Sequence, residues 1–263
     1  MTDLTLLLVA FAVLAGLFAL LYFACRWVDN YGFVDVAWSY AFALVGVTYA
    51  WLADGWYLRR FIVAGLAVLW SVRLGSHLLM RVAGHHPVED SRYVQMRRDW
   101  AGSFHAKMFG FFQLQAFTVA LLSVPFLLPM LNPAPAFHGL EMAGVTLWFT
   151  ALLGEAVADA QLAAFKRDPA RRGQVCTAGL WRYSRHPNYF FEWLVWVAYF
   201  IFALASPWGW LAVIGPASIL YLLLKVSGIP LNEEAAVRSK GDAYRRYQQT
   251  TSAFVPWPPK RLP

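Results

Sequence analysis

The sequence predicts an all-α, polytopic membrane protein with seven transmembrane helices. Of its 263 residues, 59% are hydrophobic and only 14% are charged, whereas a soluble domain carries about 25% charged residues. The hydrophobic residues are also concentrated in blocks of about twenty, the length that crosses the hydrocarbon core of a bilayer. Only short polar stretches separate the blocks, and no internal repeat marks a boundary, so we expect one domain over residues 1–263.

Seven blocks are long and apolar enough to be expected spans. They are residues 4–25, 33–52, 60–82, 108–131, 140–165, 189–204 and 208–228. The chain after the last block ends in a proline-rich tail, which cannot continue a helix because proline lacks the amide donor and clashes with the preceding turn.

The charge of the connections predicts the orientation. Basic residues are concentrated between the third and fourth spans, between the fifth and sixth, and after the seventh. Because cytoplasmic connections carry the excess of Lys and Arg, we expect the N-terminus outside and the C-terminus in the cytoplasm. Arg59 and Arg60 in the second connection run against this pattern, and we attribute them to snorkelling at the interface.

Composition also argues against two classes of partner. The formal charge of +7 is explained by the cytoplasmic connections, so no nucleic acid is expected. The chain has two cysteines, Cys25 in an apolar block and Cys176 in a polar one. Two cysteines in such different segments do not indicate a disulfide scaffold or a metal site. We therefore expect membrane lipids and a small molecule as partners, and no metal.

The first candidate cluster lies at the start of the second span. Tyr31, Asp35 and Trp38 are spaced by three or four residues and share a helix face. An ionisable side chain at the edge of a span is costly, so Asp35 is a candidate for holding a proton. The alternative, compatible with the first, is a structural hydrogen bond or ion pair between Asp35 and Arg73 or His77.

The second cluster is a polar stripe on the third span. Trp70, Arg73, His77 and Arg81 recur every three or four residues, so they lie on one side of an otherwise apolar helix. Such a stripe must face protein or a watery cavity. His77 is the expected proton donor because imidazole titrates near neutral pH, although a structural role for it is equally compatible with the pattern.

The third cluster surrounds the start of the sixth span. Pro187 can begin the helix, which places the free amides of its first turn at an end that attracts anions. Asn188 and Glu192 are four residues apart and point the same way. The candidate cofactor ligands in this cluster are Arg182, Tyr183, Arg185, His186, Asn188, Tyr189 and Glu192.

Further candidate ligands lie upstream and downstream of this cluster. They are Glu155, Asp159, Lys166 and Arg172 before it, and Asn232, Glu233 and Tyr244 after it. Acidic, amide and aromatic groups beside arginines fit a ligand that has ribose hydroxyls, flat rings and phosphates, and the basic residues offer charge for a 2′-phosphate.

At these residues the chain resembles the steroid 5-alpha-reductase-like membrane reductases, in their bacterial branch, which implies a location in a bacterial inner membrane. The resemblance covers about residues 25–258. It rests on the approach Gly179-Leu180-Trp181, the core Ser184-Arg185-His186-Pro187-Asn188-Tyr189, the pair Glu192-Trp193, the EDSRY run from Glu89 to Tyr93, and the segment from Asp35 to Trp38.

The resemblance implies a seven-helix fold that holds NADPH in a cytoplasm-facing cavity and admits a lipophilic enone, such as a 3-oxo-Δ4 steroid, from the bilayer. Hydride would pass to the β carbon of the enone and a proton to the α carbon. By matching position, Asn188 and Glu192 meet the nicotinamide end, Asp159 and the Lys166 region the adenosine and phosphate end, and Asn232 and Glu233 a lid.

One part of the family pattern has no clear match in this chain. The animal enzymes polarise the steroid carbonyl with a Tyr and Glu pair, and the second and third spans here lack an evident equivalent. Asp35 and His77, with Tyr31 and Trp38 beside Asp35, are the substitutes we expect to be catalytic.

Two other functions are compatible with the sequence. Membrane methyltransferases resembling the isoprenylcysteine carboxyl methyltransferases hold S-adenosylmethionine with a similar Arg-His-Pro-X-Tyr core and a later acidic pair. Phe190 and Phe191 stand where a smaller residue is expected in that group, and Asn188 suits a nicotinamide amide better. A lipid-binding or scaffold protein is the non-enzymatic alternative, and the polar stripes argue against it because polar groups in lipid are costly.

Overall fold

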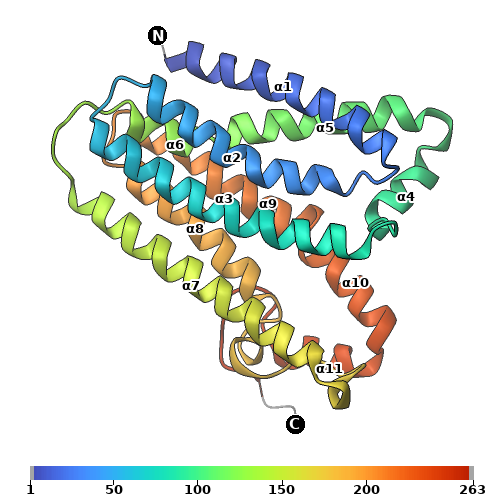
Figure 1. Ribbon diagram of the computed structural model, residues 1–263. Helices are drawn as coiled ribbons and strands as arrows, with labels where there is room; N and C mark the ends of the chain where they lie inside the picture. The colour runs from blue at the N-terminus through green and yellow to red at the C-terminus, as the bar shows by residue number, and fades with distance from the viewer. Residues whose placement is uncertain (1–2, 261–263) are drawn as a thin grey trace. The chain divides into compact units, whose positions relative to one another are not determined.

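The computed structural model describes residues 3–260, and the helices are joined by short loops (Figure 1). Within that range the regular structure is helical, apart from an isolated parallel bridge between Ser184 and Ser252. The α-helices are α1 (Asp3–Trp27), α2 (Phe33–Leu52), α3 (Tyr57–His85), α4 (Ser91–Asp99), α5 (Phe104–Leu122), α6 (Val124–Met130), α7 (Gly139–Arg167), α8 (Pro187–Ala203), α9 (Ile214–Tyr221), α10 (Ile229–Lys240) and α11 (Asp242–Thr250).

Short 3₁₀ and π segments join these helices. They are η1 (Ala101–Ser103), η2 (Pro169–Arg171), η3 (Gly179–Arg182) and η4 (Gly209–Val213), which are 3₁₀, and η5 (Leu222–Val226), which is π-helical. The expected fourth span is divided into α5 and α6 at Ser123, and the expected seventh span combines η4, α9 and η5.

Among residues 3–260, six helical segments are long and apolar enough to cross a membrane. They are Leu4–Trp27, Phe33–Leu52, Tyr57–His85, Ala101–Met130, Gly139–Arg167 and Gly209–Lys240. The remaining expected span corresponds to α8, which has 17 residues and lies at the lower limit of a spanning helix. The structure therefore supports a polytopic helical membrane protein, while the seventh span and the orientation stay predictions.

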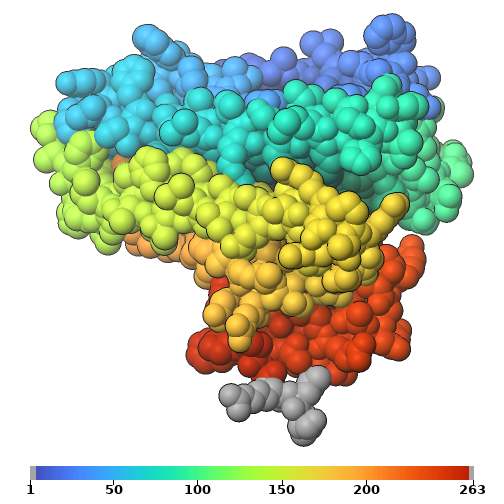
Figure 2. Space-filling view, turned by 60° about the horizontal axis from the view of Figure 1, so that its bottom comes forward, coloured from blue at the N-terminus to red at the C-terminus, as the bar shows by residue number. Residues whose placement is uncertain are grey.

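The chain divides into two compact units. Unit 1 runs to Phe137 and adds Ala203–Ile214, and unit 2 comprises His138–Phe202 and the chain from Gly215 onward. Figure 2 shows one face of the chain, with unit 1 mostly in blue to green and unit 2 in yellow-green to red.

Close approach of α2 and α3 forms the core of unit 1. A Cβ added to Gly75 would lie 2.8 Å from the ring of Tyr40, and one added to Gly46 would lie 3.1 Å from Ala67. The hydroxyl of Ser71 adds a polar tie, because it donates to a carbonyl of α2 and accepts from an α2 amide. Small residues and hydroxyl groups are typical of helix pairs packed in membranes.

Arg59 shows that the snorkelling interpretation is wrong for this residue. Its side chain is buried, with 1% of the residue exposed, and donates to the carbonyls of Asn132, Ala134 and Ala136 over 2.7–2.9 Å. Arg60 donates to the carbonyl of Ala53. Arg59 thus binds carbonyls of the loop between α6 and α7, and Arg60 binds the carbonyl of the residue that follows α2.

Two glycines of α7 let α8 pack closely in unit 2. A Cβ on Gly144 would lie 2.8 Å from Phe202, and one on Gly154 would lie 2.4 Å from the ring of Phe191. Trp193 of α8 donates to the carbonyl of Pro216 in α9 over 3.1 Å. These contacts hold the start of α8, which carries the third predicted cluster, against α7 and α9.

Candidate functional site

The approach to α8 is anchored on α7. Trp181 donates its indole N–H to the carbonyl of Ala158 over 2.9 Å, and the amide of Leu180 donates to Gln161 Oε1 over 2.8 Å. Gly179 has a φ of +59° and lies so close to Gln161 that a Cβ would come within 2.5 Å of its side chain. Only glycine adopts this conformation at low cost, which gives the Gly-Leu-Trp sequence a structural reason.

The end of the chain closes over the loop before α8. We call residues 251–260 the C-terminal strap. The Ser184 hydroxyl donates to the carbonyl of Phe254 over 2.7 Å, and the amide of Arg185 donates to the carbonyl of Ser252 over 2.8 Å. The amide of Trp257 donates to the carbonyl of Tyr183 over 2.9 Å. The strap therefore holds the Ser-Arg-His-Pro segment by its backbone.

Glu233 of α10 is the centre of a buried polar group in unit 2. Its carboxylate accepts from Arg185 Nε over 2.6 Å, from Gln248 Nε2 over 2.9 Å, and lies 3.3 Å from His186 Nε2. Arg185 Nη1 also donates to the carbonyls of Gln248 and Thr251. This geometry makes Arg185 and Glu233 ties between α8, α10, α11 and the strap, and their cofactor contacts stay predictions.

Tyr244 lies in the buried layer beneath this group. Burial, with the charge of Glu233 adding to it, raises the pKa of Tyr244 to about 12. The phenol therefore keeps its proton at physiological pH, and the neighbouring ring of Tyr247 packs edge-to-face against it at 5.7 Å. The predicted cofactor ligand Tyr244 is thus placed inside unit 2 as a neutral hydrogen-bonding group.

Two aromatic rings stack at the start of α8. The rings of His186 and Tyr189 lie 5.5 Å apart and almost parallel, with 7° between their planes. The Tyr189 hydroxyl accepts from Asn232 Nδ2 of α10 over 2.8 Å, and Asn232 also donates to the carbonyl of Gly228. The predicted ligands His186, Tyr189 and Asn232 are therefore brought together.

Asn188 carries an unused acceptor in this region. Its Nδ2 donates to Asp159 Oδ1 of α7 over 3.2 Å. Its Oδ1 is buried and accepts no hydrogen bond from any of residues 3–260. A buried polar atom without a hydrogen bond costs about 1–3 kcal/mol, so this oxygen is an available position for a ligand donor.

The remaining predicted ligands of unit 2 differ in how far their side chains are exposed. Glu155 is buried on α7, one turn before Asp159, and Glu192 accepts from the Trp196 indole over 3.0 Å. The basic and aromatic side chains are exposed to the surface: Lys166, Arg172, Arg182 and Tyr183. These side chains are accessible to a solute, as residues that bind a phosphate group must be.

A pocket of about 420 Å³ lies beside the end of α7. Gln161 and Phe165 of α7 form one side, and Arg171, Cys176 and Gly179 of the following segment form the other. The guanidinium of Arg171 lies over the ring of Phe165 at 5.3 Å. None of the predicted cofactor ligands lines this pocket, so we assign it no ligand.

In unit 1, Asp35 is paired with two residues of α4. Its carboxylate accepts from Arg92 Nη2 over 2.7 Å and from the Tyr93 hydroxyl over 2.8 Å. The partners of Asp35 thus come from α4, and not from Arg73 or His77 of α3, which were the alternative partners. We call the second contact the Asp35–Tyr93 pair.

The EDSRY run docks α4 against the start of α2. Glu89 accepts from the amide of Tyr31 and from Arg97 Nε, both over 2.7 Å, and Arg97 also pairs with Asp29 over 2.7 Å. The Arg97 guanidinium lies 4.9 Å from the ring centre of Tyr31. The predicted residue Tyr31 is therefore buried under this ion-pair group, close in the chain to Asp35.

Electrostatics keep the α4 groups in defined protonation states. Burial raises the pKa of Asp90, but hydrogen bonds from the side chain and amide of Arg92 outweigh it, so the pKa is lowered overall. Burial, reinforced by the charge of Asp35, raises the pKa of Tyr93 well above its usual value. Asp90 is therefore charged and Tyr93 neutral at pH 7.

Trp38 and His77 are not part of this group. Trp38 donates its indole N–H to the Thr118 hydroxyl of α5 over 3.0 Å, and His77 lies on an exposed side of α3. Sequence reasoning missed Tyr93, which is 2% exposed. The available signal was its position in the EDSRY run, where Asp90 caps the first turn of α4 and leaves Tyr93 one turn in.

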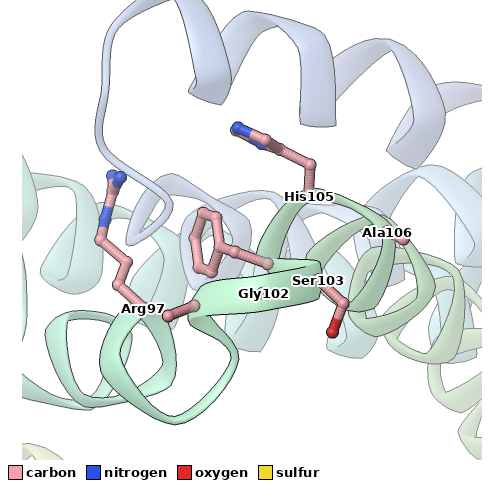
Figure 3. Close-up of a pocket in the computed structure, with 7 residues that line it drawn as sticks. Arg97, Gly102, Ser103, His105 and Ala106 are labelled. Atoms are coloured by element: carbon pink, nitrogen blue, oxygen red, sulfur yellow. The ribbon is translucent and has the colours of Figure 1, made fainter.

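A second pocket, of about 510 Å³, lies where η1 leads into α5. Figure 3 shows Arg97 and His105 pointing to one side of this pocket and Ser103 pointing to the other. Because Arg97 is already paired with Asp29 and Glu89, its charge is compensated within unit 1. We assign this pocket no ligand.

Within the described residues, no group of three or more His, Cys, Asp or Glu side chains is arranged to hold a metal ion. The thiols of Cys25 and Cys176 are buried and free.

Comparison with known proteins identifies a relative and a family. An uncharacterized protein of the yeast Schizosaccharomyces pombe is 26% identical to this chain, and the match covers 88% of the chain and 74% of the yeast protein. No solved structure matches. The family described as "Protein of unknown function (DUF1295)" matches residues 21–251, which is most of the chain, and the protein therefore belongs to this family.

Proposed function

We propose that this protein is an NADPH-dependent reductase that saturates the carbon–carbon double bond of a lipophilic enone, such as a 3-oxo-Δ4 steroid. The observation that carries the proposal is the buried Asn188 Oδ1 at the start of α8, which accepts no hydrogen bond from residues 3–260. A nicotinamide carboxamide offers the N–H donor that this oxygen lacks.

The neighbouring residues of unit 2 fit the rest of this cofactor. Asp159, which already accepts from Asn188, can accept from a ribose hydroxyl. Lys166, Arg172 and Arg182 are exposed cations suited to phosphate oxygens. When bound, NADPH supplies the hydride for the β carbon of the enone.

For the carbonyl of the substrate we propose the Asp35–Tyr93 pair in place of His77. Tyr93 is held in its protonated form, and its hydroxyl is oriented by Asp35 over 2.8 Å. That hydroxyl can exchange Asp35 for a substrate carbonyl oxygen and stabilise negative charge on it.

A membrane methyltransferase is the second candidate, because one feature of the same site favours it. Asn188 Oδ1 lies on a side chain that is bonded to the Asp159 carboxylate, and together they can accept from the α-amino group of S-adenosylmethionine. The cofactor bound by the protein separates the two candidates.

The deciding experiment measures thermal stabilisation of detergent-purified protein by NADPH and by S-adenosylmethionine in parallel. A ligand at 100 times its dissociation constant stabilises the fold by about 2.7 kcal/mol. Stabilisation by NADPH alone supports the reductase. Stabilisation by S-adenosylmethionine alone overturns it in favour of a methyltransferase, and stabilisation by neither overturns both.

Substitutions at the start of α8 test whether NADPH binds at the proposed site. Asn188→Ala and Glu192→Ala should abolish stabilisation by NADPH, whereas Gln249→Ala, which removes an exposed amide from α11, should leave it unchanged. Circular dichroism confirms that each variant keeps its helices. Unchanged NADPH affinity in Asn188→Ala would remove the observation on which the proposal rests.

A further inference from the structure

The C-terminal strap displays large apolar side chains on its outer side. Trp257 is 69% exposed, Val255 is 51% exposed, and Tyr183, whose carbonyl binds the strap, is 41% exposed. We call Tyr183, Val255 and Trp257 the strap patch.

The strap is a fixed part of unit 2. Phe254 is buried between the exposed residues and the helices, with its ring 5.7 Å from Phe190 and 5.8 Å from Trp193 of α8. The amide of Lys260 donates to the carbonyl of Thr250 over 2.8 Å, beyond the bond from Trp257 to Tyr183. Because the backbone is held on both sides of the patch, its side chains are presented without a further cost of ordering.

Between residues 242 and 260, the exposed large hydrophobic side chains are those of the strap, Val255 and Trp257. The preceding helix α11 turns Tyr244 and Tyr247 inward and carries Arg246 and Gln249 on its exposed side. A segment that contacts only water is expected to expose polar side chains, as α11 does. The fixed and exposed side chains of Trp257 and Val255 therefore indicate contact with a less polar environment.

Positive charge lies beside the strap patch. Arg182 precedes Tyr183, Lys260 follows Trp257 by three residues, and both side chains are exposed. Trp and Tyr favour the headgroup level of a bilayer, and Lys and Arg beside them attract anionic lipids. The patch therefore has the apolar and the cationic components of a membrane-surface contact.

We propose that the strap patch inserts into the headgroup region of the bilayer that this chain spans, with anionic lipid headgroups against Arg182 and Lys260. The contact holds the strap, and through it the segment Tyr183 to His186, at the membrane surface. The proposal is independent of which cofactor the protein binds.

The test places an environment-sensitive fluorophore on the strap of the full chain in lipid nanodiscs. Intrinsic fluorescence is unsuitable because the chain has 13 tryptophans. Trp257→Cys is labelled with a nitrobenzoxadiazole maleimide, Gln249→Cys on α11 is the matched control, and the unmodified chain is the labelling blank because Cys25 and Cys176 are buried. Val255→Cys is a second strap position, in case the first variant does not fold.

At the strap positions we expect a blue-shifted emission and a loss of most of the fluorescence when the nanodiscs contain nitroxide-labelled lipids, but little quenching by aqueous iodide. The label at position 249 should show the reverse. Iodide quenching at the strap equal to that at position 249 would overturn the proposal, and so would protection from both quenchers, which indicates a protein partner.

The anionic component has its own test. Replacing phosphatidylglycerol by phosphatidylcholine in the nanodiscs, or Lys260 by Gln in the labelled chain, should lower the quenching by nitroxide lipids. Equal quenching in all of these samples would overturn the assignment of anionic headgroups.

Discussion

The Tyr93 hydroxyl donates to Asp35 Oδ1 over 2.8 Å, and Arg92 Nη2 donates to the other carboxylate oxygen over 2.7 Å. Both partners lie in α4, which the ion pairs of Arg97 with Glu89 and Asp29 hold against the start of α2. We propose this phenol as the group that hydrogen-bonds to a substrate oxygen, because the direction of its proton is fixed by Asp35.

We predict that Tyr93→Phe lowers the turnover of an enone by about 100-fold or more, because hydrogen-bond donation by one positioned group contributes roughly this factor. NADPH affinity should be unchanged, since Asn188 and its neighbours are untouched. Single-turnover kinetics and thermal shift give the two values. Tyr57→Phe, at an exposed tyrosine of α3, is the control. Full turnover in Tyr93→Phe would exclude it as the group that polarises the carbonyl.

Asp90 makes stability depend on pH. Its pKa is lowered in the folded protein by hydrogen bonds from Arg92, which outweigh burial. A lowered folded pKa means that its stabilising contribution is present above the unfolded pKa, about 3.9, and is lost as pH falls through the folded value.

We therefore predict that Asp90→Asn is less stable than the wild type at pH 7 and that the difference closes as the pH is lowered below about 4. Thermal denaturation in detergent across this pH range measures the difference. Asp99→Asn, at an exposed aspartate of the same helix, should differ little from the wild type at any pH. A difference for Asp90→Asn that persists in acid would contradict the assigned pKa.

At the scale of elements, α2 and α3 pack through positions without a side chain. The Cβ of an alanine at position 75 would lie 2.8 Å from the Tyr40 ring, whereas one at position 65 of the same helix would meet no atom within 4 Å. The two glycines thus separate the effect of packing from that of helix propensity.

We predict that Gly75→Ala destabilises the protein by about 1–3 kcal/mol, because overpacking forces the helices or the Tyr40 ring to shift. Gly65→Ala should be neutral or stabilising by up to about 1 kcal/mol, since alanine favours the helix. Denaturation in mixed micelles measures both. Equal effects of the two changes would show that α2 and α3 do not depend on this contact.

The start of α10 is joined to α8, α11 and the strap through Glu233. Arg185 and Glu233 both have about 10–15% of their side chains exposed, so removing one charge leaves the other nearly buried. The neighbouring Glu234 is exposed and pairs only with the exposed Arg238 among the described residues, a contact that contributes little.

We predict that Glu233→Gln destabilises unit 2 by roughly 3 kcal/mol or more and increases hydrogen exchange in α11 and the strap, whereas Glu234→Gln changes neither. Thermal denaturation and hydrogen exchange by mass spectrometry provide the comparison. Unaltered exchange in residues 242–260 of Glu233→Gln would show that Glu233 does not hold these elements together.

At the scale of the whole molecule, the number of spans decides on which sides of the membrane the two ends lie. With 17 residues, α8 is about 26 Å long, close to the roughly 30 Å of the hydrocarbon core. An odd number of spans places the ends on opposite sides, and an even number places them on the same side.

We predict seven spans, with the C-terminus in the cytoplasm and the N-terminus outside. Reporters fused to either end, one active only in the cytoplasm and one only outside, measure this directly. A reporter inserted near Pro135, in the connection before α7, should report the same side as the N-terminus. Both ends on one side would show that α8 does not span the bilayer.

Local pattern was enough to predict the long apolar helices of this protein, but not α4, α10 and α11, which lie in polar segments. The apolar block at 33–52 coincides with α2, and the expected spans in α1, α3 and α7 end within three residues of the observed helices. An apolar block of this length has one stable form in a bilayer, because a helix satisfies every backbone hydrogen bond within the segment itself. The all-α membrane class follows from the sequence for this reason.

Contacts between residues that are distant in the chain could be identified only from the tertiary structure. Asp35 pairs with Arg92, 57 residues away, and Arg59 is buried against a loop 73 residues away, whereas its position in a short connection had indicated snorkelling. The buried acceptor of Asn188 likewise depends on how α7 lies against α8. Hydrogen bonds and ion pairs between elements depend on which helix faces meet, and the periodicity of one segment contains no information on its neighbour.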